Sequence, residues 1–221
     1  SIGRQYAGRD GTIDYYHAGE FSEAIADHIQ RQTEILLARN EPLLAFQAGM
    51  DALRKYSDYS IDDSNGDYAL ITDAMDDMCM DVLAATDEMI AEKIFNILAD
   101  CVKSDREDWF VQDFASQMVF SHFAGKHFDE KRLALADEQI AALTLSVKKD
   151  YSSEYKMEKL LTRRFDLMKK LSLPKEELDA FLDRYTNYSD IRKLRVQQAL
   201  DEGKTDEAIR LLEEGKAADR D

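Results

Sequence analysis

The amino-acid sequence predicts an all-α fold, and two features carry that prediction. Apolar residues recur at helical spacing along almost all of the 221 residues, which is the periodicity of amphipathic helices. The chain has only 2 prolines and 9 glycines, and most of them fall between the periodic segments. No segment alternates between apolar and polar residues as a half-buried strand does, so we expect no sheet.

About ten helices are expected, in chain order from residue 21 to residue 217. The first covers residues 21–38, and the second begins near Pro42, a residue that suits the first turn of a helix. A loop of turn-forming residues follows over 58–67. Ser104 and Glu107 have the spacing of a capping box that opens the helix over 107–124. Gly203 is placed to end one helix and Thr205 to cap the next. The other expected ranges are 67–85, 87–103, 129–147, 153–171, 174–186, 189–202 and 205–217.

Helices of this length with short loops suggest antiparallel hairpins, which either stack as a solenoid or close into an irregular bundle. A weak sequence similarity between two segments of the chain favours stacking. The segment from Leu37 to Phe46 aligns with the segment from Leu200 to Ile209. A helix-ending residue (Asn40 or Gly203) and a small alanine (Ala45 or Ala208) fall at matching points of the two segments. Both segments look like the turn and second helix of a tetratricopeptide-type pair. The sequence therefore predicts hairpins stacked as an irregular, tetratricopeptide-like superhelix.

The charge is unevenly distributed. Lysine and arginine number 29 against 45 aspartates and glutamates, a formal net charge of -16. Residues 1–150 carry 14 basic and 29 acidic side chains, a net charge of -15, whereas residues 151–221 carry 15 and 16, a net charge of -1. We therefore predict an acidic helical region over 1–150, continuous with near-neutral hairpins over 151–221. Strong unguided binding to DNA or to an anionic membrane is disfavoured.

Targeting signals and cysteine usage favour the cytoplasm. No stretch approaches the roughly 20 apolar residues that span a bilayer, and the first residues contain no apolar core of a signal peptide. Cys79 and Cys101 lie inside apolar-periodic segments without metal-ligand spacing, so we expect two buried, reduced thiols.

Four stretches together resemble the helical region found beside the zinc finger in bacterial SWIM zinc-finger proteins. The stretches are Ile13 to Ala18, Asn40 to Phe46, Ile61 to Asp67 and Glu202 to Gly215. The most specific are the two that bear aspartates, Ile13 to Ala18 and Ile61 to Asp67. The resemblance implies a helical accessory region of largely uncharacterised role, downstream of a finger that precedes Ser1. The family's zinc-binding C-x-C-xn-C-x-H motif does not occur in this sequence, so no zinc role is carried over to any residue.

Aspartates dominate one loop and the helix after it. Asp62 to Asp67 resembles a calcium loop in composition, but with Gly66 in the sixth position the first ligand would be Ile61 and the twelfth Thr72. An Asx-turn and a helix cap at Tyr68 explain the same residues. Asp73, Asp77 and Asp81 repeat every four residues, so they lie along one helix face. This face is either a solvated surface or the binding site of a basic partner.

Catalytic and metal-binding motifs are missing from the sequence. None of the histidines lies four residues from another, and no nucleophile elbow, P-loop or dinucleotide-binding motif occurs. We expect no catalytic residue, no metal ligand and no cofactor. His17 suits a buried hydrogen-bonded role, and His122 and His127 suit helix ends where a ring nitrogen meets free carbonyls. The other histidine is His28.

A basic stripe runs along the expected helix over 153–171. It consists of Lys156, Lys159, Arg163 and Lys170, flanked by Arg164 and Lys169. The intervening acids Glu154, Glu158 and Asp166 favour a solvated face whose charges pair with each other, and contact with nucleic-acid phosphates is the alternative. Aromatic residues with mostly helical spacing are expected in the core: Trp109, Phe110, Phe114, Phe120, Phe123 and Phe128.

These observations predict a non-catalytic helical-repeat module that binds a protein partner, with Asp73, Asp77 and Asp81 as the contact residues. The alternative is an accessory domain that assists DNA binding by an upstream zinc finger through Lys156, Lys159, Arg163 and Lys170. A third class, a helical-bundle hydrolase or metalloenzyme, would need converging acids and histidines.

Overall fold

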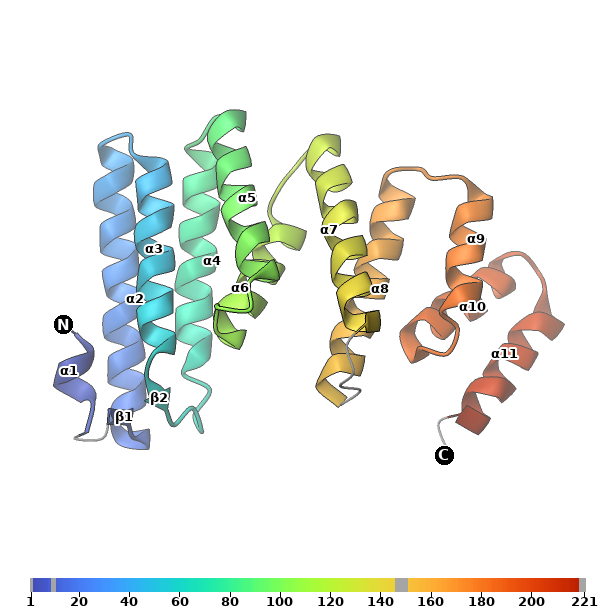
Figure 1. Ribbon diagram of the computed structural model, residues 1–221, viewed down its shortest axis with the longest axis horizontal. Helices are drawn as coiled ribbons and strands as arrows, with labels where there is room; N and C mark the ends of the chain where they lie inside the picture. The colour runs from blue at the N-terminus through green and yellow to red at the C-terminus, as the bar shows by residue number, and fades with distance from the viewer. Residues whose placement is uncertain (1, 9–10, 146–150, 219–221) are drawn as a thin grey trace. The chain divides into compact units, whose positions relative to one another are not determined.

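The computed structural model describes residues 2–8, 11–145 and 151–218, and it confirms the all-α prediction (Figure 1). These residues form eleven helices and two strands of two residues each. Tetratricopeptide-like stacking is not confirmed. None of the described helices is both long and apolar enough to cross a membrane. The final residues of the helix expected over 129–147 lie outside the described residues.

The chain divides into two compact units, Ser1–Phe123 and Ala124–Asp221. The first unit carries 24 acidic and 9 basic side chains, a net charge of -15, whereas the second carries 21 and 20, a net charge of -1. The charge asymmetry therefore follows the two units. The sequence divided the chain at residue 150 because residues 124–150 carry five acids and five bases, so net charge cannot place the boundary within them.

The first unit is built from long helices that lie side by side (Figure 1). Its elements are α1 (Gly3–Tyr6), β1 (Thr12–Ile13), α2 (Tyr15–Ala38), α3 (Pro42–Ser57), β2 (Ser60–Ile61), α4 (Tyr68–Ala84), α5 (Glu88–Lys103) and α6 (Trp109–Ser121). Helix α2 packs against both α3 and α4, and α5 packs against α6. Helix α3 also contacts α4, α5 and α6, so it holds the two groups of helices together.

The two strands pair in parallel, so the expectation of no sheet was wrong at this one place. Thr12 lies opposite Ser60, and Ile13 lies opposite Ile61. The Ile13 carbonyl also accepts the N–H of Asp62 at 3.0 Å. Strands of two residues are too short to show alternation, and their pairing joins segments far apart in the sequence. The pairing brings together the two aspartate-bearing stretches that stand out in the sequence.

Two helices of the first unit begin at other residues than the periodicity predicts. Helix α2 begins at Tyr15 rather than Phe21, because the Asp14 side chain caps it and accepts the N–H of Tyr16 and of His17. Helix α6 begins at Trp109.

The capping box predicted from Ser104 and Glu107 was wrong. The Asp108 side chain caps α6 by accepting the N–H of Phe110 at 2.8 Å. Glu107 instead binds the Arg54 guanidinium of α3, with Nη2 to Oε1 at 2.9 Å.

Aromatic rings pack between α2 and α3 in the core of the first unit. Phe21 and Tyr56 are fully buried and stacked, with ring centroids 5.3 Å apart. The Tyr56 hydroxyl lies 2.8 Å from the Ser22 hydroxyl, which is equally buried. Burial raises the pKa of Tyr56 to about 12. These contacts fix α2 against α3.

The two turns that align in the sequence, at Asn40 and at Gly203, share one backbone geometry. Asn40 and Gly203 both have positive φ angles, 59° and 73°. In each turn the next residue donates back into the helix, Glu41 to the Leu36 carbonyl and Lys204 to the Ala199 carbonyl. This is the hydrogen-bond pattern of a Schellman helix end.

Beyond the turns the two segments differ in burial. Ala45 and Ala208 are both 1% exposed, but Phe46 is buried whereas its counterpart Ile209 is 49% exposed. The likeness is therefore confined to the turn and the small alanine.

The second unit consists of two longer and three shorter helices. They are α7 (Lys126–Leu145), α8 (Tyr151–Lys170), α9 (Lys175–Arg184), α10 (Ser189–Asp201) and α11 (Thr205–Ala218). Helix α7 packs against α8, α8 contacts α9 and α10, and α10 packs against α11. Phe165 and Phe181 stack between α8 and α9, and the α10–α11 hairpin closes over Val196, Ala199, Ala208 and Leu211.

Candidate functional site

The exposed face of α4 carries the three aspartates that the sequence singled out. Asp73, Asp77 and Asp81 are all exposed, and in the described part of the chain none of them takes part in a recorded hydrogen bond or ion pair. We call this set the acidic ridge. The opposite face of α4 is buried and fixes the rotation of the helix; its buried residues are Ile71, Met75, Met78, Cys79 and Val82.

Two apolar side chains lie on the same face as the acidic ridge. Leu70 is 42% exposed and Met80 is 53% exposed. Leu70 precedes Asp73 by three residues and Met80 follows Asp77 by three, so both share the face of the ridge. The surface therefore combines uncompensated negative charge with exposed apolar area.

The neighbouring carboxylate of α4 has a different role. Asp76 accepts a hydrogen bond from, or pairs with, the His122 ring, with Nε2 to Oδ1 at 2.7 Å. His122 is the C-cap residue of α6, so this contact joins α4 to the end of α6. The sequence placed His122 at a helix end correctly, but its ring binds a carboxylate there.

His17 is also hydrogen-bonded, to Asp14 at 2.7 Å, yet its side chain is 51% exposed, so the buried role predicted for it was wrong.

The loop before α4 contains the predicted Asx-turn. Asp62 Oδ1 accepts the Ser64 N–H at 3.1 Å. The donor at the start of α4, the Tyr68 N–H, is satisfied by Asp63 at 2.8 Å, and Asp67 makes no capping bond although it is the N-cap residue. Asp62 and Asp63 therefore act first as acceptors of backbone N–H groups.

The basic stripe of α8 is partly engaged within the second unit. Lys170 Nζ lies 3.0 Å from Oδ1 of Asp129, whose side chain is only 5% exposed. Lys156 is exposed, whereas Lys159 and Arg163 are half-buried and make further contacts. The acid Glu158 accepts the backbone N–H of Asp190 at 2.6 Å. The structure thus spreads the four predicted residues over different environments instead of presenting them as one free surface.

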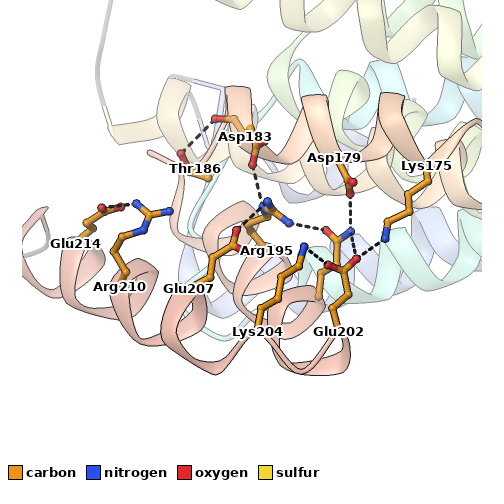
Figure 2. A network of polar contacts seen from close by, with 11 residues as sticks. Lys175, Asp179, Asp183, Thr186, Arg195, Glu202, Lys204, Glu207, Arg210 and Glu214 are labelled. Carbon is orange, nitrogen blue, oxygen red and sulfur yellow. Dashed lines mark hydrogen bonds and ion pairs between the residues drawn. The ribbon is translucent and has the colours of Figure 1, made fainter.

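A polar network joins α9, α10 and α11, and the sequence analysis did not predict it (Figure 2). At its centre is the Arg195 guanidinium, 11% exposed, which contacts Asp183 of α9 and Glu207 of α11, each at 2.9 Å. The members come from helices that only the fold brings together. Sequence spacing within one helix cannot reveal such a network.

Glu202 forms the second centre of this network. It contacts Lys175 at 2.5 Å and Lys204 at 2.7 Å, and these two ammonium groups lower the pKa of Glu202 to about 2, chiefly through their hydrogen bonds. Gln198 links the two centres, because it contacts both Arg195 and Glu202. The charges of this network are satisfied internally, which favours a structural role.

A groove of about 640 Å³ lies between α7, α8 and α9. Its wall includes Arg164, which binds Asp137 at 2.5 Å and lies over the Phe181 ring at 4.7 Å from the centroid. The guanidinium is therefore already paired on both sides, and the groove offers no free charge at this point.

The two cysteines are free and buried. Burial raises the pKa of Cys79 and of Cys101. Cys101 accepts a contact from Arg54 Nη2 at 3.3 Å, within the Arg54–Glu107 pair. In the part of the chain that the structure describes, no three histidine, cysteine, aspartate or glutamate side chains converge on a metal site.

One aromatic residue departs from the core prediction. Phe110, Phe114, Phe123 and Phe128 are buried and Phe120 is half-buried, but Trp109 is 61% exposed. Trp109 lies on the face of α6 away from the buried face that includes Phe114 and Val119.

Scans against family models, curated proteins and solved structures found no match to this chain.

Proposed function

We propose that this protein is a non-catalytic helical interaction module whose first unit binds a basic segment of a partner protein through the acidic ridge of α4. One observation carries the proposal: Asp73, Asp77 and Asp81 are exposed, unpaired within the described residues and interleaved with exposed Leu70 and Met80. A helix with lysine or arginine on the same face as leucine matches this surface in charge and in polarity.

The charge of the first unit supports the same partner. A net charge of -15 over 123 residues attracts a basic segment over a distance comparable to the Debye length, about 8 Å at physiological salt. The acidic ridge then supplies the local contacts. The resemblance to the helical region of SWIM zinc-finger proteins agrees with an accessory interaction role, and it stays a prediction.

The test uses a fluorescein-labelled amphipathic helical peptide made of lysine and leucine, titrated with the full chain and followed by fluorescence anisotropy. The ridge variant replaces Asp73, Asp77 and Asp81 by asparagine. Each exposed ion pair contributes about 0.2–1 kcal/mol, so loss of three pairs weakens binding roughly 3- to 150-fold. The same titration at about 1 M salt should weaken wild-type binding, because exposed charges are screened.

A matched control removes the same charge elsewhere in the first unit. Glu20, Glu23 and Asp27 are exposed acids at helical spacing on α2, and the control variant replaces them by glutamine, glutamine and asparagine. We expect this variant to bind nearly as well as the wild type. Equal weakening by both variants would show that only net charge matters, and it would contradict a binding surface on α4.

Assistance of DNA binding by the α8 stripe is the competing function. The Lys170–Asp129 contact and the further contacts of Lys159 and Arg163 make this surface the less favourable one. Saturable, salt-dependent binding of labelled duplex DNA that Lys159→Glu and Arg163→Glu abolish would reverse this preference.

A further inference from the structure

Three aromatic rings meet where α4 and α6 begin. The Tyr68 ring lies 6.3 Å from the Trp109 ring and 4.9 Å from the Phe110 ring, measured between centroids. Trp109 and Phe110 are 5.7 Å apart in an edge-to-face arrangement. We call these three residues the aromatic corner. Phe110 is buried and Tyr68 half-buried, and they hold the exposed Trp109 ring in place from one side.

Two carboxylates are fixed beside these rings by the backbone. Asp63 accepts the N–H of Tyr68 and Asp108 accepts the N–H of Phe110, both at 2.8 Å and both through Oδ1. In the described residues neither Oδ2 atom has a recorded partner. Burial raises the pKa of Tyr68, and the charges of Asp63 and Asp108 raise it further. Both carboxylates therefore act on the same hydroxyl.

An exposed tryptophan beside two fixed carboxylates suits a cation. The face of an indole ring attracts ammonium and guanidinium groups, and a planar guanidinium can stack on a ring while its N–H groups bond to carboxylates. Asp62 and Asp105 add negative charge in the same two loops, and Arg106 is the basic residue there. Tryptophan is enriched among the residues that dominate binding energy at protein interfaces.

We infer that the aromatic corner receives an arginine side chain of a basic protein segment, with the guanidinium over Trp109 and bonded to the carboxylates of Asp63 and Asp108. This inference rests on the proposed function, because it assumes that the first unit binds a basic segment. It adds a second point of contact, in loops that precede α4 and α6, and it specifies arginine over lysine.

Trp109 is the single tryptophan of the chain, so its fluorescence reports on the corner alone. The test titrates the full chain with an arginine–leucine peptide and with a lysine–leucine peptide of the same length and charge. We expect a saturable change of the tryptophan emission with the arginine peptide and tighter binding of that peptide. Equal affinity and no change in emission with either peptide would overturn the inference.

Variants of the aromatic corner separate the contribution of the Trp109 ring to peptide binding from that of the two carboxylate charges. Trp109→Ala should weaken binding of the labelled arginine peptide about 2- to 30-fold, and Asp63→Asn or Asp108→Asn should weaken it while keeping the backbone hydrogen bond. The matched control is Met89→Ala on α5, because Met89 is also 61% exposed. Arg106→Ala, which removes a competing cation, should strengthen binding.

The two claims fail in different ways. If the ridge variant loses affinity while Trp109→Ala binds like the wild type, arginine binding at the aromatic corner is contradicted and the proposed function is supported. If Trp109→Ala loses affinity while the ridge variant binds like the wild type, binding at the aromatic corner is supported and binding at the acidic ridge is contradicted. If neither peptide binds, the proposed function fails and the corner fails with it.

Discussion

The acidic ridge should cost the first unit stability, and the cost can be worked from its spacing. Asp77 has like-charged neighbours four residues away on both sides, whereas Asp73 and Asp81 each have one. A like-charge pair at this spacing destabilises a helix by about 0.2–0.5 kcal/mol. Because asparagine and aspartate have similar helix propensities, Asp77→Asn should raise the free energy of unfolding by about 0.4–1 kcal/mol.

The assay is urea denaturation of the full chain, followed by tryptophan fluorescence, because the only tryptophan lies in the first unit. Measurements at low salt and at about 1 M salt separate charge repulsion from other causes, since repulsion between exposed groups is screened. The reasoning is refuted if Asp77→Asn is no more stable than the wild type, or if the gain persists unchanged at high salt. A gain in stability together with weaker peptide binding would identify the ridge as a surface kept for function.

Three further results are expected. Tyr56→Phe or Ser22→Ala alone should lower the free energy of unfolding by about 1–3 kcal/mol, because a buried hydroxyl loses its partner. The double variant should lose less than the sum of the two single losses. Urea titrations of the wild type and the three variants check this, and strict additivity would contradict it. Glu202, with its pKa lowered from 4.5 to about 2, should contribute stability that is fully present above about pH 4.5 and is lost as the pH falls toward 2. Circular dichroism during acid titration should therefore show Glu202→Gln changing less between these pH values than the wild type, and identical curves would rule out the contribution. Because burial raises the pKa of Cys79 and Cys101, neither thiol should react with a disulfide reagent in the native protein, and both should react in urea; rapid reaction without denaturant would show that the thiols are accessible.

Local signals predicted most of the fold. The helix expected over 87–103 is observed as Glu88–Lys103, and those expected over 189–202 and 205–217 are observed within one residue of their limits. Asn40 and Gly203 end their helices with positive φ angles, because a left-handed residue is a local requirement of such a turn. Periodicity and turn chemistry act within a few residues, so the sequence alone can display them.

The errors arose where a distant residue decides the structure. Glu107 has capping-box spacing to Ser104, but Arg54, 53 residues earlier, binds its carboxylate. The β1–β2 pairing depends on contacts between residues 12–13 and 60–61. Neither partner is visible within the local window that periodicity uses.

The candidate site was predicted in part. Spacing placed Asp73, Asp77 and Asp81 on one face, and the structure shows that all three are exposed. Trp109 was assigned to the core together with a set of aromatic residues whose spacing is mostly helical. Its phase on α6 instead places it on the face of positions 112, 113 and 116, none of which is buried, and away from the buried Phe114 and Met118.

The most direct test of the binding surface is a map of amide chemical shifts in the full chain on addition of the lysine–leucine peptide. The account predicts that the largest shifts fall on α4 around Leu70, Asp73, Asp77, Met80 and Asp81, and that they disappear in the variant with asparagine at the three ridge positions. Shifts confined to residues 124–221, or shifts on α4 that persist in that variant, would contradict the account.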